Sequence, residues 1–534
     1  MNIHVPEFSR RRFLRALGHG ALLAALPSAL LAEEGDVVTI SLLHTTDLHG
    51  HILPTFDYDG NPDLGGLARC VTQIRQWQQA NPHSLLLDIG DVYQGTEVSL
   101  RTRGETMIRC FNALKYDAWV VGNHDFDWGF ETLVSSVSHS SMPVLSGNAI
   151  VNFGLNLRPP SSSGTFSQPP AAFSNYLFRE VAGFRIAIIG LTTPGLPTWL
   201  PPEDLGGFEV FDPIVALRNL LAEVSAQKPD AIVVTGHMGV TRRDDDANRV
   251  GALTREFPQL TVYIGGHTHK NYSGELVNGV LYTQADHYGI YAGKVDLTFD
   301  RTSRRLLRRE AVTIQMDSQF ALDPLVLSLA HADLDAADLV LKREIGELTE
   351  PFDIASAFAQ PSDVERLIGS AMKASLRKHG IEVDAVVHGL FDHKNPLGPG
   401  SKTVADTWDI LPYENDIVTI EVSRDDLLAI ARDLGSGREY RSVMGVTVVG
   451  TSRGHWFQVD DLRAADGSPL PDKPSYRIAF NSYDSQSGGG RFTTVGRLVR
   501  DSANKRILYA IDTRDALIDF FVTRQKVGKA SLLV

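Results

Sequence analysis

Five short segments, far apart in the sequence, carry side chains of the types that bind divalent metal ions. Aspartate, histidine and asparagine recur in them, and cysteine is absent from the set. Mixed carboxylate, imidazole and amide donors suit Mn²⁺, Zn²⁺ or Fe²⁺ and argue against a structural zinc site. The segments are His44-Thr45-Thr46-Asp47-Leu48-His49, Gly90-Asp91, Gly122-Asn123-His124-Asp125, Gly236-His237 and Gly265-Gly266-His267-Thr268-His269.

The number of donors in these segments exceeds what one four-coordinate ion needs. Two ions that share a carboxylate would use all of them. Two ions roughly 3.5–4 Å apart stabilise the attacking and leaving oxygens of an in-line displacement. The pattern therefore predicts a dinuclear metal centre that catalyses such a displacement.

Each segment follows a run of aliphatic and β-branched residues that predicts a strand. We expect these strands at 37–43, 85–89, 118–121, 231–234 and 262–264. Apolar residues at helical spacing lie between several of them, notably at 67–77, 107–114 and 214–224. Alternating strands and helices are typical of an α/β sheet, in which the C-terminal ends of the strands form one rim. The five segments should therefore meet at one place.

The order of these motifs resembles that of the calcineurin-like metallophosphoesterases. Residues 46–50 (Thr-Asp-Leu-His-Gly) and 122–129 (Gly-Asn-His-Asp-Phe-Asp-Trp-Gly) are similar in particular to the exported 5′-nucleotidase family. The resemblance covers roughly residues 38–525. It implies an α/β metallophosphoesterase fold, built as a β-sheet sandwich flanked by helices, with a second α+β C-terminal domain that binds substrate.

The resemblance also implies roles for individual residues. Two divalent ions would share Asp91, and a metal-bound water or hydroxide would attack the phosphorus of a nucleotide or a related phosphate ester. His124, oriented by Asp127, would stabilise the transition state, because a carboxylate beside an imidazole favours the charged ring. The implied ligands are Asp47, His49, Asp91 and His269 for the first ion, and Asp91, Asn123, His237 and His267 for the second.

The sequence pattern changes after about residue 310. We expect the metal-binding domain at 38–310, a helical linker at 311–344 with its helix at 322–341, and the C-terminal substrate domain at 345–525. In the family two aromatic rings clamp the nucleobase, and the matching positions are Trp456 and Phe492. Packing in a hydrophobic core is the alternative for either ring.

The substrate pocket departs from the family pattern. The usual asparagine is His388, the usual phosphate-binding arginine is His393, and Arg491 stands in the last glycine-rich loop as a replacement cation. Asn481 lies in a segment that keeps the family pattern. Because a neutral imidazole does not grip phosphate as a guanidinium does, we expect the chemistry to be retained and the usual nucleotide contacts to be altered.

The first 32 residues predict a signal peptide. Ser9-Arg10-Arg11-Arg12-Phe13-Leu14 precedes an apolar stretch at 16–32 that is short for a bilayer, and the arginines resemble a twin-arginine export motif. We therefore expect a periplasmic or otherwise exported protein that meets a membrane only through an uncleaved signal. A basic tail with an apolar anchor is the alternative.

Composition sets limits on the class of protein. The chain has 534 residues, of which 43% are hydrophobic and 22% charged, which is ordinary for a globular protein of more than one domain. A formal net charge of −13 argues against duplex nucleic acid as a partner.

The chain has two cysteines, Cys70 and Cys110, which either form a disulfide or remain free thiols. The sequence does not define the oligomeric state.

Two other functions stay open. An exported thiosulfohydrolase of sulfur oxidation shares this architecture, but that family lacks the Asn-His-Asp-Phe stretch that is intact at 123–126. A non-catalytic binding protein that keeps its metals would be favoured by loss of Asn123 or His124, and both are present.

Overall fold

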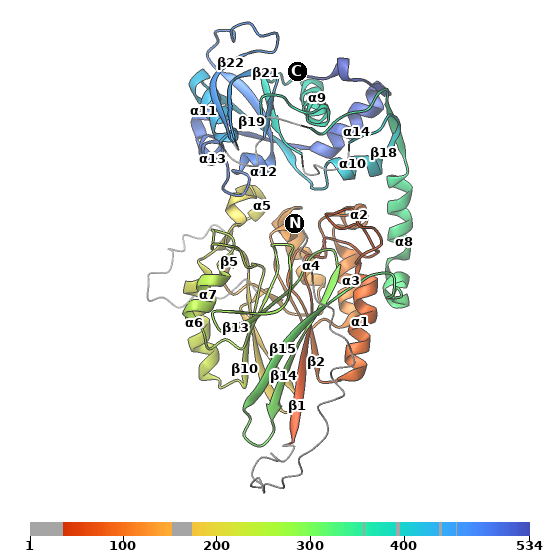
Figure 1. Ribbon diagram of the computed structural model, residues 1–534, viewed down its shortest axis with the longest axis vertical. Helices are drawn as coiled ribbons and strands as arrows, with labels where there is room; N and C mark the ends of the chain where they lie inside the picture. Colours follow the sequence, from red (N-terminus) through yellow and green to blue (C-terminus); the bar gives the residue numbers. More distant parts are fainter. Residues whose placement is uncertain are drawn as a thin grey trace, which may run out of the picture.

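The computed structural model describes residues 36–151, 173–355, 358–390, 396–436, 441–454 and 456–533. The predicted signal peptide and His393 lie outside these residues. Two bodies are stacked along the long axis, and helix α8 (Pro324–Leu341) connects them along one side (Figure 1). Within the described ranges, no helix is both long and apolar enough to cross a bilayer.

Two β-sheets face each other in the first body. Leu42 and Leu85 from one sheet and Ile188 and Val233 from the other belong to the same buried core between them. The first sheet has the order β15-β14-β1-β2-β3-β4-β6, with bounds Leu306–Gln315, Tyr291–Asp300, Val37–Thr45, Ser84–Asp88, Ala118–Val120, Val144–Leu145 and Phe173–Ser174. The second has the order β12-β13-β11-β10-β8-β7, with bounds Asn271–Val277, Val280–Ala285, Val262–Gly265, Ala231–Gly236, Phe184–Leu191 and Tyr176–Val181.

Helices cover the outer face of each sheet. Helices α1 (Leu67–Ala80), α3 (Glu105–Leu114) and α4 (Phe130–His139) pack on the first sheet, and α6 (Pro213–Ala226) and α7 (Val250–Glu256) pack on the second. Two short helices, α2 (Glu97–Thr102) and α5 (Pro202–Leu205), and a small sheet of β5 (Ala149–Val151) and β9 (Phe208–Val210) complete this body. The predicted sandwich flanked by helices is confirmed.

Parallel pairing determines where the metal-binding segments go. Strands β1, β2, β3, β4 and β6 are parallel to one another, as are β8, β10, β11 and β13. Their C-terminal ends therefore share one edge of the sandwich. This edge faces the second body (Figure 1).

The second body is built on a five-stranded sheet of order β20-β17-β23-β19-β24, with bounds Ser442–Met444, Ala385–His388, Tyr476–Asn481, Asp416–Val422 and Ile507–Asp512. Helices α9 (Asp363–Lys378) and α14 (Thr513–Arg524) contribute to one core and α11 (Arg424–Leu434) and α13 (Thr493–Arg500) to another. The remaining elements are β16 (Glu344–Leu348), β18 (Gly400–Thr403), α10 (Val404–Ile410), the hairpin β21–β22 (Val446–Arg453, Trp456–Ala464), α12 (Ser482–Ser485) and β25 (Lys526–Val527).

The connecting helix α8 begins where local chemistry favours it. The Asp323 side chain accepts hydrogen bonds from the backbone N–H groups of Leu325 and Val326, and Pro324 occupies the first helical position. Val326 and Ala330 are buried against the first body.

Both bodies extend beyond the limits expected from the sequence. Strand β15, before this helix, ends at Gln315, past the expected limit at 310. Leu532 joins the core of the second body, past the expected limit at 525.

The two cysteines are buried and are not joined to each other. The Cys70 thiol donates a hydrogen bond to the Gly289 carbonyl. Burial raises the pKa of both thiols to about 12, so both are neutral at ordinary pH. Of the two alternatives left open by the sequence, the structure has the free thiols.

Candidate functional site

The predicted metal ligands converge at the shared edge of the sandwich. Asp47 and His49 follow β1, and Asp91 follows β2. The other candidates follow β3, β10 and β11. Their side chains form two groups in which the potential ligand atoms lie within 4.8 Å of one another: Asp47, His49, Asp91 and His269 in the first, and Asp91, His237 and His267 in the second.

Asp91 belongs to both groups. Its Oδ2 atom lies 3.0 Å from His237 Nε2 and 3.7 Å from His49 Nε2. His269 Nε2 lies 3.4 Å from Asp47 Oδ1 and 3.1 Å from His49 Nε2. A carboxylate that contacts imidazoles of both groups is placed to bridge two neighbouring cations.

The backbone is unusual at these ligands. Asp47, His49, Asp91, His267 and His269 all have positive φ, between 47° and 72°. Non-glycine residues adopt this region rarely and at a cost, and such residues cluster at functional sites. The surrounding turns therefore hold these side chains in orientations that ordinary strand or helix geometry would not provide.

The charges and hydrogen bonds of the site fit bound cations. Burial opposes ionisation of Asp91, but the imidazoles, above all His237, bring its pKa well below the usual range. Burial lowers the pKa of His267 to about 3, so its ring is the neutral species that ligates metals. Among the described residues, the buried Asn123 Oδ1 atom has no hydrogen-bond partner. An unpaired buried oxygen in the ligand segment that follows β3 is explained if it is a ligand.

His124 and Asp127 lie next to this centre. His124 Nδ1 and Asp127 Oδ2 are 2.7 Å apart, and the His124 backbone N–H donates to Asp91 Oδ1 at 2.8 Å. Burial lowers the pKa of His124, but the carboxylates of Asp127 and Asp91 outweigh it and raise the pKa to about 9. The ring can therefore carry a proton beside the metal groups.

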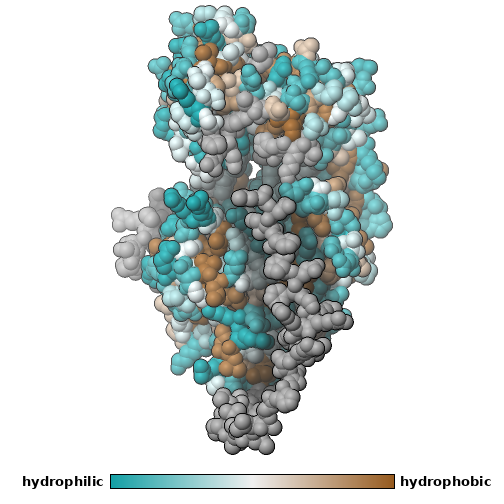
Figure 2. Space-filling view, viewed as in Figure 1, coloured by the Kyte–Doolittle hydropathy of each residue, from teal (hydrophilic) through white to brown (hydrophobic). Residues whose placement is uncertain are grey.

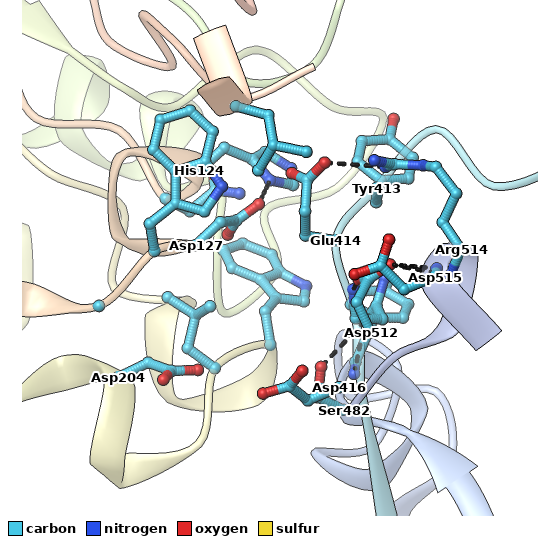
Figure 3. Close-up of a pocket in the computed structure, with 18 of the residues that line it drawn as sticks. His124, Asp127, Asp204, Tyr413, Glu414, Asp416, Ser482, Asp512, Arg514 and Asp515 are labelled. Carbon is cyan, nitrogen blue, oxygen red and sulfur yellow. Dashed lines mark hydrogen bonds and ion pairs between the residues drawn. The ribbon is translucent and has the colours of Figure 1, made fainter. Parts of the chain in front are cut away.

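A cavity of about 1140 Å³ opens beside the centre, between the two bodies. Asn123, His124 and His267 lie on the side of the first body, and Tyr413, Tyr483 and Arg491 on the side of the second. Figure 3 shows His124 and Asp127 on one wall and Tyr413, Glu414 and Arg514 on the opposite wall. The molecular surface is hollowed between the two bodies (Figure 2).

Trp456 and Phe492, the predicted base clamp, do not line this cavity. Trp456 is 48% exposed at the start of β22, next to Phe457, whose backbone N–H donates to the Gly435 carbonyl at the C-terminal end of α11. Phe492 is 1% exposed and packs in the core with Val495 and Leu498. Phe492 therefore packs in the core, which is the alternative left open by the sequence, and the role of Trp456 in binding the base stays a prediction.

The other predicted substrate contacts divide into two kinds. Arg491 lines the cavity and donates to Tyr483 Oη at 2.8 Å. Asn481 is fully buried and caps α12, its side-chain oxygen accepting from the Asp484 N–H at 2.7 Å. His388 is fully buried at the end of β17, where burial lowers its pKa to about 4. Asn481 and His388 are not among the residues that line this cavity, and their roles as substrate contacts stay predictions.

Sequence reasoning missed the rings that do line the cavity. These are Trp128, Trp199, Tyr413 and Tyr483. Tyr413 stacks on His124, with ring centroids 5.3 Å apart and planes 18° apart. Both tyrosines stand in segments that resemble the family, 412–415 and 480–483, so the sequence contains a signal for them without a role attached to it.

Comparison with known proteins supports this interpretation of the site. The calcineurin-like phosphoesterase model matches residues 40–271, and the 5′-nucleotidase C-terminal domain model matches residues 344–497. Together they cover most of the chain. The protein belongs to the metallophosphoesterases that carry a 5′-nucleotidase C-terminal domain, in agreement with its motifs.

Individual relatives are distant. The chain is 26% identical to a 5′-nucleotidase of Diplobatis ommata, over 96% of this chain and 92% of that protein. It is 25% identical to endonuclease YhcR of Bacillus subtilis, over 86% of this chain but only 38% of that longer protein. It likewise spans only 20% of the trifunctional nucleotide phosphoesterase YfkN of the same organism.

Solved structures share the fold. A putative 5′-nucleotidase from Staphylococcus aureus superposes with a TM-score of 0.73 at 21% identity, over 92% of this chain and all of that one. The sulfate thiohydrolase SoxB from Thermus thermophilus superposes with a TM-score of 0.64 at 17% identity, over 95% of this chain and 96% of that one. The fold alone therefore does not separate the phosphoesterases from the thiosulfohydrolases.

Proposed function

We propose that the protein is an exported two-metal phosphoesterase that hydrolyses nucleotides or related phosphate esters. The observation that carries the proposal is the pair of ligand groups joined at Asp91, with His124 beside them, at the wall of a cavity of about 1140 Å³. A cavity of this size accommodates a nucleotide-sized ligand.

We propose Mn²⁺, Zn²⁺ or Fe²⁺ as the two cations, because the donors are carboxylate, imidazole and amide. The first would be held by Asp47, His49, Asp91 and His269, and the second by Asp91, Asn123, His237 and His267. Cations bound there would supply an activated water and positive charge for the phosphoryl oxygens.

The remaining steps belong to this chain's own side chains. His124 would donate a hydrogen bond to the phosphoryl group or leaving oxygen as negative charge develops there. Asp127 accepts from the other ring nitrogen, fixes the tautomer and stabilises the charged ring. Asp91 holds the His124 backbone in place through its Oδ1 atom and thereby ties the ring to the metal groups.

We propose that the organic part of the substrate packs against Tyr413 and Tyr483, rather than against Trp456 and Phe492. Both tyrosines line the cavity on the side opposite the metal groups. Arg491, which donates to Tyr483, provides a cation at the same wall. A phosphate on the metals with an aromatic base between the tyrosines would span the two bodies.

The test is a hydrolysis assay of residues 33–534 reconstituted with each metal. The panel contains nucleoside monophosphates, 2′,3′-cyclic nucleotides, nucleotide sugars, sugar phosphates and a thiosulfate derivative. We expect metal-dependent phosphate release from at least one nucleotide class. Hydrolysis of the thiosulfate derivative alone would establish the thiosulfohydrolase alternative, and no turnover at all with two metals bound would establish a binding protein.

We also propose export by the twin-arginine route, on the basis of Arg10, Arg11 and the Phe13-Leu14 pair. Replacement of both arginines by lysine should leave the precursor in the cytoplasm. Cell fractionation checks this, and normal export of the double variant would rule out the route.

A further inference from the structure

The outer nitrogens of the candidate ligand histidines are held in two different ways. His237 Nδ1 lies 2.6 Å from the Ile89 carbonyl oxygen, and His49 Nδ1 lies 2.9 Å from the Gln94 carbonyl oxygen. Both acceptors are main-chain groups in the segment that follows β2. The Nδ1 atom of His269 instead lies 2.6 Å from the hydroxyl of Tyr58, a side chain from a surface loop.

The position of the His269 ring assigns the direction of this hydrogen bond. Its Nε2 atom faces His49 Nε2 at 3.1 Å and Asp47 Oδ1 at 3.4 Å, so Nε2 is the nitrogen that faces the first ligand group. A neutral imidazole whose Nε2 lone pair is free to ligate carries its proton on Nδ1. With Nε2 as the metal ligand, His269 Nδ1–H would therefore donate to the Tyr58 oxygen.

We propose that Tyr58 is a positioning residue that orients His269 for the first metal ion. A hydrogen-bonded partner on the outer nitrogen fixes the tautomer and the rotation of a ligand imidazole and increases its basicity. This inference rests on the two-metal centre of the proposed function. It adds a residue that no motif marks, since Tyr58 lies outside all five ligand segments.

The loop that carries Tyr58 is built to hold it. Backbone hydrogen bonds between Thr55 and Leu64, at 2.7 and 3.0 Å, close the base of the loop. Asp57 accepts from the N–H groups of Asp59 and Asn61, at 2.9 and 2.8 Å, and thereby fixes the turn. Tyr58 is 50% exposed as a residue, while its hydroxyl points inward to His269 from the base that the loop provides.

A second histidine fixes the plane of the Tyr58 ring. The rings of Tyr58 and His287 stack with centroids 4.1 Å apart and planes 14° apart. His287 is 3% exposed, and its Nδ1 atom lies 2.5 Å from Asp286 Oδ1. His287 also stacks on His269, at 4.9 Å and 12°. Tyr58, His287 and His269 therefore form one packed unit whose hydroxyl is aimed at the ligand.

The same hydroxyl reaches the second body. A hydrogen bond from Tyr58 acts to lower the pKa of Tyr413, although burial dominates and raises it. Tyr413 is the cavity ring that stacks on His124. Tyr58 therefore contacts both the candidate ligand His269 in the first body and the Tyr413 ring of the second.

The test is Tyr58→Phe in the full chain, because this change keeps the ring and its stacking and removes only the hydroxyl. Metal affinity is measured by chelator competition with Zn²⁺ or Mn²⁺ followed by metal analysis. We expect one of the two ions to bind about 10–100-fold more weakly and the other to be unchanged, as for other losses of an outer partner of a metal ligand. Tyr176→Phe is the matched control, since its hydroxyl donates to Glu223 far from the centre.

The outcomes separate this inference from the proposed function. Two ions bound by the wild type, with affinities within twofold in Tyr58→Phe, would overturn the role of Tyr58 and leave the function standing. Fewer than two ions in the wild type would overturn the two-metal centre itself. Equal weakening in Tyr58→Phe and Tyr176→Phe would also contradict the inference, because it would indicate a general loss of stability.

Discussion

Asp91 and His124 are in direct contact, yet their side chains have different surroundings. Asp91 touches imidazoles of both ligand groups, whereas the His124 ring is held by Asp127, stacks on Tyr413 at the cavity wall and meets only the edge of one ligand ring, His49. Replacement of a residue shared by two cations should reduce metal binding. Replacement of a residue that faces the substrate should instead reduce turnover. This difference gives the sharpest test at the scale of single residues.

Asp91→Asn should lower the occupancy of both metal sites, because an amide cannot balance two dications. His124→Ala should keep both ions and lower kcat by about 10²–10⁴-fold, the range for loss of a positioned proton donor. Its kcat should fall more than its KM rises. Metal analysis and steady-state kinetics of both variants check this, and a metal ion missing from His124→Ala would contradict the separation.

Two turns must approach closely for the ligands to meet. A Cβ atom on Gly122, in the turn after β3, would lie 2.2 Å from Asp91 Oδ1 and 2.4 Å from the Asp91 nitrogen, in the turn after β2. Asp125 joins the same turns, its carboxylate accepting from the Val92 and Gly122 N–H groups at 2.8 Å each. At the scale of elements, the centre depends on backbone contact between successive strand ends.

Gly122→Ala should therefore displace Asp91, destabilise the fold by about 1–3 kcal/mol as other overpacked sites do, and weaken metal binding. The matched control is Gly398→Ala, where a Cβ would have no neighbour within 4 Å. Thermal unfolding and metal content are measured on both variants. Wild-type metal content in Gly122→Ala would show that the turn can move without disturbing Asp91.

The cavity exists only because two bodies meet. Arg506 of the second body pairs with Glu203 of the first at 2.7 Å, and Gln94 of the first donates to Glu414 of the second at 3.0 Å. These contacts place Tyr413 and Tyr483 opposite the metal groups. At the scale of the whole molecule, substrate binding therefore depends on which side chains of the second body face the gap.

Tyr483→Ala should raise KM for base-containing substrates by about 5–150-fold, which corresponds to about 1–3 kcal/mol for a lost base–aromatic contact. It should have little effect on a minimal aryl phosphate. Trp456→Ala is the comparison, since that ring is exposed and does not line the cavity. Equal losses on both substrates for Tyr483→Ala, or a nucleotide-specific loss for Trp456→Ala, would contradict the proposed assignment.

The sequence by itself determined the parts of this protein that local rules control. Each ligand segment follows its own strand, and parallel strands deliver their C-terminal ends to one edge, so the order of strands and ligands is enough to predict that Asp47, Asp91 and His237 meet. The apolar spacing predicts the connecting helix at 322–341, and the helix runs from Pro324 to Leu341, because capping and apolar spacing are also local signals.

Only the tertiary structure decided what faces the substrate. Whether Trp456, Phe492, Tyr413 or Tyr483 lines the cavity depends on how a hairpin, a core and two loops of the second body are turned toward the first, and no spacing in the sequence encodes that orientation. The same holds for Tyr58, whose hydroxyl contacts the His269 ring although the two residues are more than 200 positions apart in the sequence. The candidate metal ligands come together at strand ends, whereas the cavity lining depends on how two bodies with separate hydrophobic cores are placed against each other.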